Sequence, residues 1–316
     1  NKQGEPVIGV FANRTHEVIP IDNCLIQNKK SEEIAKFIIE FIKEKNISIY
    51  DEKTGKGLVR HIVTKVGIKT GEIMCVIVIN GHKIPNENEL VENLKTRYPE
   101  IKAIVKNINM KNTNVILGQE NINLYGNGYI EDILGEYKFK ISPLSFYQVN
   151  PVQAEKLYNL GVSMAEITKN DVVFDLYCGI GTISLFMSKF AKKVYGIEIV
   201  EEAVKMAKEN AQNNNVSNTE FFAGDVEIVL DDLINNKGLK ADVVMFDPPR
   251  KGLDKKSIDN ILNIRPKKIV YISCNPATLI RDLADFENEY DIKTIIPVDM
   301  FPFTSHVECV ATLQLK

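Results

Sequence analysis

The chain has 316 residues, of which 44% are hydrophobic and 26% are charged, and its formal net charge is −3. A chain of this length and composition can bury a large core, and we expect it to form two domains. No apolar run reaches the length of a membrane span, and we expect no signal peptide and no membrane partner. Five cysteines without close pairing argue against a disulfide framework and favour a reducing, cytoplasmic location.

Residues 1–140 are expected to form an α+β domain. A helix is predicted from Ser31 to about Lys45, with Ser31 as its N-cap and Glu33 in its first turn. Two strands should follow as a hairpin through the turn at 69–71. The predicted elements after the first helix are the two hairpin strands, a second helix and a last strand, at 57–64, 72–79, 87–98 and 103–109.

A glycine turn marks the start of the second half of the chain. Residues 172–177 form an apolar run of strand length that ends at Cys178-Gly179-Ile180-Gly181-Thr182, and a helical pattern follows. Strand, glycine turn and helix in this order bring backbone N–H groups close to a nucleotide-like ligand. A dinucleotide fingerprint would need a third glycine where this chain has Ser184.

Carboxylates stand at the ends of the next three predicted strands. Glu198 follows Gly179 by nineteen residues, a spacing at which a side chain can accept both ribose hydroxyls of a nucleoside. Asp225 is placed to bind an adenine amino group, and Asp247 opens the rigid turn 247–250, which contains two prolines. This series suits S-adenosylmethionine better than NAD. The alternative for Glu198 is a solvated carboxylate at a strand end.

A cysteine follows the predicted strand at 268–273. In an open parallel sheet, chemistry gathers just past the carboxyl ends of the strands. A thiol at this place, on the same sheet as a cofactor loop, suggests that Cys274 performs covalent catalysis. The alternative is that Cys274 is a small apolar residue that only fills space.

With these motifs in view, the chain resembles the RNA uracil-5-methyltransferase family. The motifs that carry the resemblance are SFYQVNP at 145–151, DLYCGIGT at 175–182, DPPRKG at 247–252, SCNPATLIRD at 273–282 and HVECV at 306–310. Within the family, the likeness is greatest to bacterial enzymes that make 5-methyluridine in 23S ribosomal RNA. The branch that modifies tRNA is the near alternative.

The resemblance implies a Rossmann-like class-I S-adenosylmethionine-dependent methyltransferase domain at 171–316, an α/β fold. The smaller α+β domain at 1–140 would precede it, with a linker and a helix at 141–170 between them. The cofactor residues that the resemblance and the strand-end pattern assign are Gln148, Tyr177, Gly179, Gly181, Thr182, Glu198, Asp225 and Asp247. Thr182 stands where some relatives carry asparagine.

The chemistry of uracil methylation asks for a nucleophile and a base. C5 of uracil becomes nucleophilic when a thiolate adds to C6, and a base must then remove the C5 proton so that the thiolate can leave. The family places these groups at Cys274 and Glu308, and a partly desolvated carboxylate at Glu308 could have its proton affinity raised toward the working pH. For Glu308 the alternative is a salt-bridge partner at a strand edge.

Three further functions stay open. His306 stands two residues before Glu308 and would share its face of a strand, which allows a thiol hydrolase built on Cys274 and His306. Such a hydrolase would not need the series of strand-end carboxylates. A class-I methyltransferase with a non-RNA substrate is the second of these functions, and a catalytically inactive RNA-binding module is the third.

The partner expected from the resemblance is RNA, and no obligate protein partner is indicated. Residues 53–111 contain eleven Lys and Arg against five Asp and Glu, whereas residues 151–316 contain nineteen against twenty-four. This basic region could follow phosphates, or it could be a solvated charged face. Relatives carry an upstream β-barrel RNA-binding domain and cysteines that hold an iron–sulfur centre. We expect a fragment without them, in which Cys24 matches one cluster ligand but holds no metal.

Overall fold

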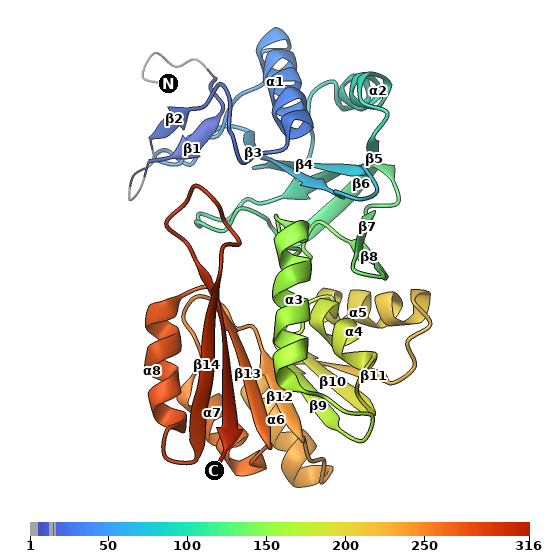
Figure 1. Cartoon of the computed structure of the whole chain (residues 1–316). Helices are drawn as coiled ribbons and strands as arrows, with labels where there is room; N and C mark the ends of the chain where they lie inside the picture. Colours follow the sequence, from blue (N-terminus) through green and yellow to red (C-terminus); the bar gives the residue numbers. More distant parts are fainter. Residues whose placement is uncertain (1–5, 13–14, 16) are drawn as a thin grey trace. The chain divides into compact units, whose positions relative to one another are not determined.

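The computed structural model describes residues 6–12, 15 and 17–316 of the chain (Figure 1). The first three residues, at which the sequence opens, lie outside this described part. The chain forms two units, one from residues 1–132 with 142–144 and one from residues 133–141 with 145–316. No helix in the described part is long and apolar enough to cross a membrane.

A four-stranded sheet forms the centre of the first unit. Its order is β3-β4-β5-β6, and β4 pairs parallel with β5 while the other pairs are antiparallel. Every residue of β4 is buried, since both of its faces are apolar, and helices α1 and α2 pack on one of them. The elements of this unit are β1 Gly9–Phe11, β2 Val18–Pro20, α1 Lys29–Glu44, β3 Val59–Val66, β4 Ile73–Ile79, α2 Glu87–Arg97, β5 Ile101–Ile108 and β6 Glu120–Gly126.

The predicted elements of the first unit exist, with one helix start displaced. The hairpin through 69–71 is confirmed, because β3 and β4 pair antiparallel on either side of it. Helix α1 begins at Lys29, and its N-cap is Asn28, whose side chain accepts a hydrogen bond from the Lys30 N–H. The prediction of Ser31 as N-cap is therefore wrong, and the acidic residue of the first turn is Glu32.

A seven-stranded sheet with the order β11-β10-β9-β12-β13-β15-β14 forms the centre of the second unit. The first five strands are parallel, and β15 and β14 run antiparallel to their neighbours. Its strands are β9 Val172–Leu176, β10 Lys193–Glu198, β11 Thr219–Ala223, β12 Val243–Phe246, β13 Lys268–Ser273, β14 Tyr290–Val298 and β15 Glu308–Leu315. A two-stranded sheet, β7 Ile130–Leu134 and β8 Tyr137–Ile141, precedes this unit's first helix.

The strand order reverses between β9 and β12. From β9 the chain moves outward through β10 and β11, and it then returns to β12 on the other side of β9. Ligands of open α/β sheets bind outside the carboxyl ends of the strands at such a reversal. The expected Rossmann-like α/β fold is confirmed, and its binding edge is the one at which β9, β10, β12 and β13 end.

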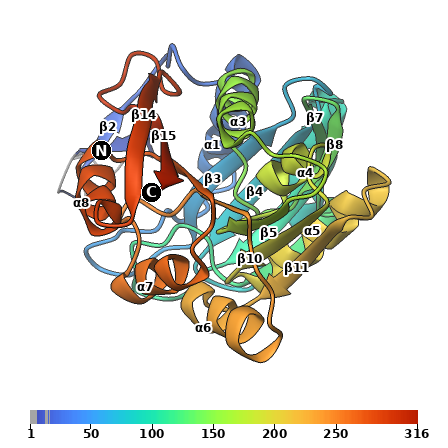
Figure 2. The same cartoon turned by 60° about the horizontal axis from the view of Figure 1, so that its bottom comes forward.

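Helices cover both faces of this sheet (Figures 1 and 2). Residues of α6, α7 and α8 share one apolar core with alternate residues of the strands, among them Phe174, Val244 and Tyr271. On the other face, α3 packs closely on β13, with Gly161 against Ile272. The helices are α3 Pro151–Ala165, α4 Thr182–Ser188, α5 Glu201–Asn213, α6 Val226–Asp231 with the π-helical turn η1 Asp232–Asn236, α7 Lys255–Ile264 and α8 Pro276–Phe286.

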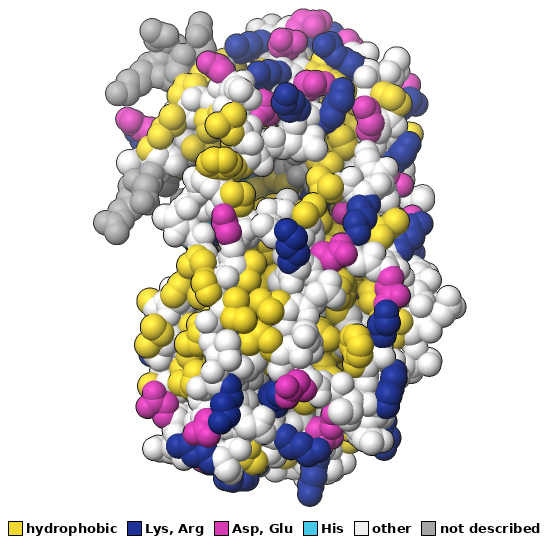
Figure 3. All heavy atoms as spheres, viewed as in Figure 1, with side chains coloured by type: hydrophobic (Ala, Val, Ile, Leu, Met, Phe, Trp, Pro, Cys, Tyr) yellow, Lys and Arg dark blue, Asp and Glu magenta, His cyan; other side chains and the backbone are white. Residues whose placement is uncertain are grey.

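Strand β14 is the edge of the sheet. Figure 3 shows hydrophobic side chains at the viewed surface around this strand, where Ile295 is exposed. The chain then turns back through residues 299–307 into β15, which brings the start of β15 to the edge at which β13 ends. The last two strands therefore return the chain to the binding edge.

Candidate active site

The glycine turn after β9 has the backbone of a ligand-binding loop. Gly179 and Gly181 have φ values of +55° and +82°, which favour glycine, and Tyr177 between β9 and the turn also has a positive φ. A Cβ added to Gly179 would meet no atom within 4 Å, so open space lies beside its backbone. The turn can therefore receive a ligand close to its N–H groups.

Glu198 joins this turn to the end of the neighbouring strand. The Gly179 N–H donates to Glu198 Oε2 at 3.1 Å, and the Val200 N–H donates to Oε1 at 2.9 Å. Each carboxylate oxygen has a further lone pair with which it can accept a ligand hydroxyl. The structure thus brings Glu198 and the glycine turn together, as the spacing of nineteen residues predicts.

Ser184 replaces the third glycine of a dinucleotide fingerprint. Its hydroxyl donates to Asp175 Oδ2 at 2.5 Å, and both side chains are buried. Burial raises the pKa of Asp175 to about 7, although the Ser184 hydroxyl opposes this shift. The hydrogen bond fastens the first turn of α4 to β9, directly behind the glycine turn.

Tyr177 and Asp225 follow the ends of β9 and β11 and lie close to each other. Asp225 is the N-cap of α6, and its side chain accepts from the Glu227 N–H at 3.1 Å. Burial raises the pKa of Tyr177 to about 12; the nearby Ser257 side chain opposes this shift, and the Asp225 charge adds to it. These two predicted cofactor residues are therefore close enough to interact electrostatically.

The ladder between β13 and β15 aligns the predicted nucleophile with the predicted base. The last pair of this antiparallel ladder is Ser273 with Cys309, so Cys274 directly follows one member of the pair and Glu308 directly precedes the other. Cys309 faces the core formed with α6, α7 and α8, and Glu308 therefore points to the opposite face of the sheet. Glu308 is only 3% exposed.

Asp247 shares this face of the sheet. Phe246 packs in the core on the α6, α7 and α8 side, so Asp247, the residue that follows it, points to the side of Glu308. Burial raises the pKa of Asp247 well above its usual value, and the charges of Glu308 and Asp175 raise it further. Three carboxyl groups thus lie near one another at the carboxyl edge.

Arg250 is a positive charge that acts on both Glu308 and Cys274. Burial raises the pKa of Glu308 to about 7, and Arg250 opposes this shift. The pKa of the Cys274 thiol is raised by burial and then by the charges of Glu308 and Asp247, while Arg250 lowers it. No sequence motif assigned Arg250 to the site, although its place at the end of a strand-end turn was a usable signal.

A buried tyrosine completes this side of the site. Gln148 is buried, and Gln148 and Thr182 lie close enough to Tyr158 of α3 for their side chains to lower its pKa. Burial raises the pKa of Tyr158, and the Asp247 charge raises it further. The structure therefore brings Gln148, Thr182 and Asp247 together around Tyr158. Nothing in the sequence distinguished this tyrosine from other apolar positions of its helix.

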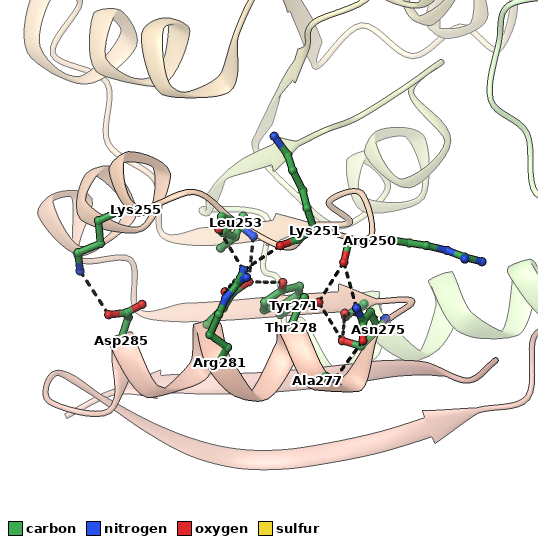
Figure 4. A network of polar contacts seen from close by, with 12 residues as sticks. Arg250, Lys251, Leu253, Lys255, Tyr271, Asn275, Ala277, Thr278, Arg281 and Asp285 are labelled. Carbon is green, nitrogen blue, oxygen red and sulfur yellow. Dashed lines mark hydrogen bonds and ion pairs between the residues drawn. The ribbon is translucent and has the colours of Figure 1, made fainter. Parts of the chain in front are cut away.

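The loop that carries Arg250 is fastened to the turn that carries Cys274 (Figure 4). The Arg250 carbonyl oxygen accepts from Asn275 Nδ2 at 3.1 Å and from the Thr278 hydroxyl at 3.3 Å. The side chain of Arg250 points away from this network (Figure 4). The loop backbone is thereby held by α8 while the guanidinium stays available to the site.

Asp282 of α8 anchors the far end of the same loop. Its Oδ2 accepts from the Leu253 N–H at 2.9 Å and from the Tyr271 hydroxyl at 2.7 Å, and Arg281 pairs with Oδ1. Gly252 has a φ of +76°, and a Cβ added there would lie 2.4 Å from Asp282 Oδ2. The close approach of loop and helix therefore requires glycine at this position.

His306 and Cys24 were the two further side chains with a possible role in a site. The expectation that His306 shares a strand face with Glu308 is wrong, because β15 begins at Glu308 and His306 is exposed in the preceding loop. The Cys24 N–H donates to Glu32 Oε1 at 2.7 Å. In the part of the chain that the structure describes, no three His, Cys, Asp or Glu side chains could hold a metal ion.

The basic region 53–111 offers less charge to a ligand than its composition suggests. The Arg60 guanidinium donates to the carbonyl oxygens of Asn109 and Lys111, and its side chain is fully buried. Lys106 is also buried and pairs with Glu87 at 2.7 Å. The exposed cations of this region are Lys53, Lys56, Lys69, Lys83, Arg97, Lys102 and Lys111.

Comparisons with known proteins agree with the architecture of this site. The model of a family described as tRNA (Uracil-5-)-methyltransferase matches residues 11–316. An uncharacterized RNA methyltransferase of Caldanaerobacter subterraneus subsp. tengcongensis is 50% identical over 311 residues, which are 98% of this chain and 69% of that protein. Another from Staphylococcus aureus is 46% identical over 316 residues, 100% of this chain and 70% of that protein.

A solved structure is similar over nearly the same range. It is the Pyrococcus abyssi tRNA (uracil-54, C5)-methyltransferase in complex with S-adenosyl-L-homocysteine, with a TM-score of 0.78 and 31% sequence identity. The match covers 96% of this chain and 72% of that chain. The similarity extends over both units of the structure.

Proposed function

This chain belongs to the tRNA (uracil-5-)-methyltransferase family, whose members use S-adenosylmethionine, and we propose that it methylates C5 of a uracil in RNA through a covalent adduct with Cys274. One observation carries the proposal. Cys274 and Glu308 are the residues directly next to the last pair of β13 and β15, Ser273 with Cys309, at the edge where the glycine turn also lies. A nucleophile and a base thus stand beside a cofactor site.

The glycine turn and its carboxylates fit S-adenosylmethionine, which supplies the methyl group when it is bound. The open space beside Gly179 admits the cofactor, and Glu198 would accept its ribose hydroxyls. Asp225 would accept the adenine amino group, and Tyr177 lies close to Asp225. Gln148 and Thr182, which lie beside Tyr158, would line the other end of the site together with Gly181 and Asp247.

The first step assigned to the protein is addition of the Cys274 sulfur to C6 of the uracil. The electron pair of the C5–C6 double bond moves onto C5 and O4, and C5 can then take the methyl group. The thiol must first lose its proton to solvent, to which Cys274 is partly exposed, and its raised pKa makes that costly. Arg250 favours the thiolate, because its charge lowers the pKa of Cys274.

The second step is removal of the C5 proton by Glu308. The carboxylate takes the proton, the C5–C6 double bond forms again, and the bond between C6 and the Cys274 sulfur breaks to return the thiolate. A pKa of about 7 suits a group that must accept a proton near neutral pH. Burial of Glu308 thus supports its role as the base.

For the RNA substrate, we propose 23S ribosomal RNA, on the likeness of the five motifs to the bacterial enzymes of that branch. A second candidate is tRNA, which is favoured by the tRNA (uracil-54, C5)-methyltransferase of similar structure. In both cases the uracil must leave its stack to expose C6 to Cys274. The exposed cations within 53–111 are candidates for contacts with neighbouring phosphates.

A thiol hydrolase built on Cys274 and His306 has less support, because His306 is exposed in the loop before β15 while Glu308 is buried. The experiment that tests the proposal is incubation of the chain with labelled S-adenosylmethionine and either 23S rRNA fragments or tRNA. Mass spectrometry of the digested RNA should find labelled 5-methyluridine. Label only in protein, or in a base other than uracil, would contradict the proposal.

A further inference from the structure

The loop between β14 and β15 contains a turn with an unusual residue at its third position. In Phe301-Pro302-Phe303-Thr304, the Thr304 N–H and hydroxyl both donate to the Phe301 carbonyl oxygen, at 3.2 and 2.8 Å. Phe303 has a φ of +65°. Proline at the second position and a positive φ at the third are typical of a type II turn, whose third position normally holds glycine or asparagine. Here a phenylalanine occupies it.

The side chain of Phe303 is almost completely in solvent. It is 89% exposed, the highest value among the large hydrophobic side chains of the described residues. A left-handed backbone conformation is costly for a residue with a Cβ, and exposure of an aromatic ring to water is unfavourable as well. Both costs are present in the free protein, and glycine at this position would avoid both. Backbone strain of this kind is concentrated at functional sites and ligand clamps.

The two ends of the loop are held in place, although the side chain of Phe303 projects into solvent. Asn150 Nδ2 donates to the Met300 carbonyl oxygen at 3.1 Å, and the rings of Phe301 and His306 meet edge to face at 6.3 Å. Figure 1 shows the loop extending beyond the ends of β14 and β15. The turn lies five residues before Glu308, so the loop stands at the same edge of the sheet as the proposed base.

We propose that Phe303 stacks on a base of the RNA strand next to the target uridine and so occupies the space that the uridine leaves. This inference rests on the proposed function. A uridine that swings out of its stack leaves the neighbouring base with an uncovered face. An aromatic side chain can cover such a face whatever the base, since every base has a π surface. Because the turn stands at the same edge as Glu308, the Phe303 ring is available where the RNA strand must open to release the uridine.

The surroundings of Phe303 favour a single flat ligand over a protein surface. The residues that follow it, Thr304, Ser305 and His306, are exposed and polar. A protein partner would normally require a broader apolar patch than one ring. A nucleotide base requires only the ring and polar groups beside it, and these are what the turn presents.

The test compares three substitutions of Phe303 with one control. Phe303→Ala and Phe303→Gly remove the ring, and Phe303→Trp keeps an aromatic face. The control is Phe190→Ala, because Phe190 is 44% exposed but lies between α4 and the start of β10, at the amino end of that strand. The quantity measured is kcat/KM for methylation of an RNA that the unchanged chain methylates, with S-adenosylmethionine binding measured by calorimetry for each variant.

Loss of the ring should lower kcat/KM roughly 10- to 100-fold in the Ala and Gly variants, the range expected for one stacked base. Phe303→Trp should retain most activity, and Phe190→Ala and cofactor affinity should stay unchanged. Phe303→Gly should also raise the thermal unfolding midpoint, because it relieves the strained φ. This combination of lower activity and higher stability would not arise from a merely structural role.

A photochemical measurement identifies the contact directly. RNA with 5-iodouridine beside the target should cross-link to the peptide that contains Phe303, and the cross-link should vanish in Phe303→Gly. Equal kcat/KM for the unchanged chain, Phe303→Ala and Phe303→Gly would overturn this inference and leave the methyltransferase activity standing. If the unchanged chain methylates no uracil in any RNA, the proposed function fails, and this inference fails with it.

Discussion

Glu308 and Cys274 both lie next to the last pair of β13 and β15, although they are 34 positions apart in the sequence. The adjacency follows from the antiparallel register, in which Ser273 lies opposite Cys309. This register brings the Glu308 carboxyl, whose pKa is raised to about 7, close to the Cys274 thiol. The Glu308 charge therefore raises the pKa of that thiol. In the proposed mechanism the two residues are separable by experiment, since one acts before methyl transfer and the other after it.

The first prediction concerns the cofactor. Glu198→Ala should weaken binding of S-adenosylmethionine roughly 10- to 100-fold, because hydrogen bonds to a carboxylate are lost and the Gly179 N–H loses its acceptor. Glu220→Ala is a matched control, since Glu220 lies near the start of β11, away from the carboxyl edge. Isothermal calorimetry measures both. Equal affinity of the Glu198 variant and the unchanged chain would remove the ribose assignment.

The second prediction concerns pH. Glu308 accepts a proton only when it is ionised, so elimination should speed up as pH rises through about 7. Arg250 lowers the pKa values of both Glu308 and Cys274, and Arg250→Gln should therefore move the rising limb of the rate profile to higher pH. The measurement is the single-turnover rate of product release across the neutral pH range, from mildly acidic to mildly basic buffers.

Two control variants accompany this pH experiment. Arg250→Lys keeps the charge and should leave the midpoint near its original pH. Arg265→Gln removes an exposed arginine that pairs with Glu289 beyond the end of α7, and it should leave the profile unchanged. A rate profile of Arg250→Gln that coincides with the original would contradict the electrostatic role of Arg250.

The third prediction concerns the loop that carries Arg250. Gly252→Ala should lower stability by about 1 to 3 kcal/mol more than Gly238→Ala does, by the usual cost of overpacking. Both glycines have a positive φ, +76° and +65°, but a Cβ at Gly252 meets Asp282 whereas a Cβ at Gly238 meets nothing. Chemical denaturation measures the difference. Gly252→Ala should also reduce methyl transfer. Equal stability of the two variants would show that the loop can move to admit a Cβ at no cost in stability.

The binding edge of the second unit was predictable because parallel strands end at one edge of a sheet. The turn at 177–181, Glu198 and Asp247 each follow an apolar run of strand length, and the fold brings them together. The exact start of a strand was harder to predict from the sequence. His306 and Glu308 are two residues apart, but the strand begins only at Glu308, and sequence pattern does not determine a boundary to that accuracy.

The sequence also did not predict which of two possible N-caps begins α1, or which charged side chains are buried. Asn28 and Ser31 are both good N-caps, and the helix begins after Asn28, whose side chain accepts from the Lys30 N–H. Counting charges between residues 53 and 111 could not show that Arg60 and Lys106 are buried in ion pairs and hydrogen bonds. Tyr158 contacts Gln148 and Thr182 from a helix that the sequence predicted only as a linker.

The covalent mechanism is tested most directly by trapping the adduct. Glu308→Gln keeps the shape of the side chain but cannot take a proton, so addition and methylation should proceed while elimination stalls. After incubation with RNA and S-adenosylmethionine that carries a labelled methyl group, denaturing gel electrophoresis should show a labelled protein–RNA band for Glu308→Gln. Cys274→Ala should show no band and no methylated RNA, with unchanged cofactor affinity. Normal turnover by Glu308→Gln without any adduct, or methylation by Cys274→Ala, would contradict the mechanism.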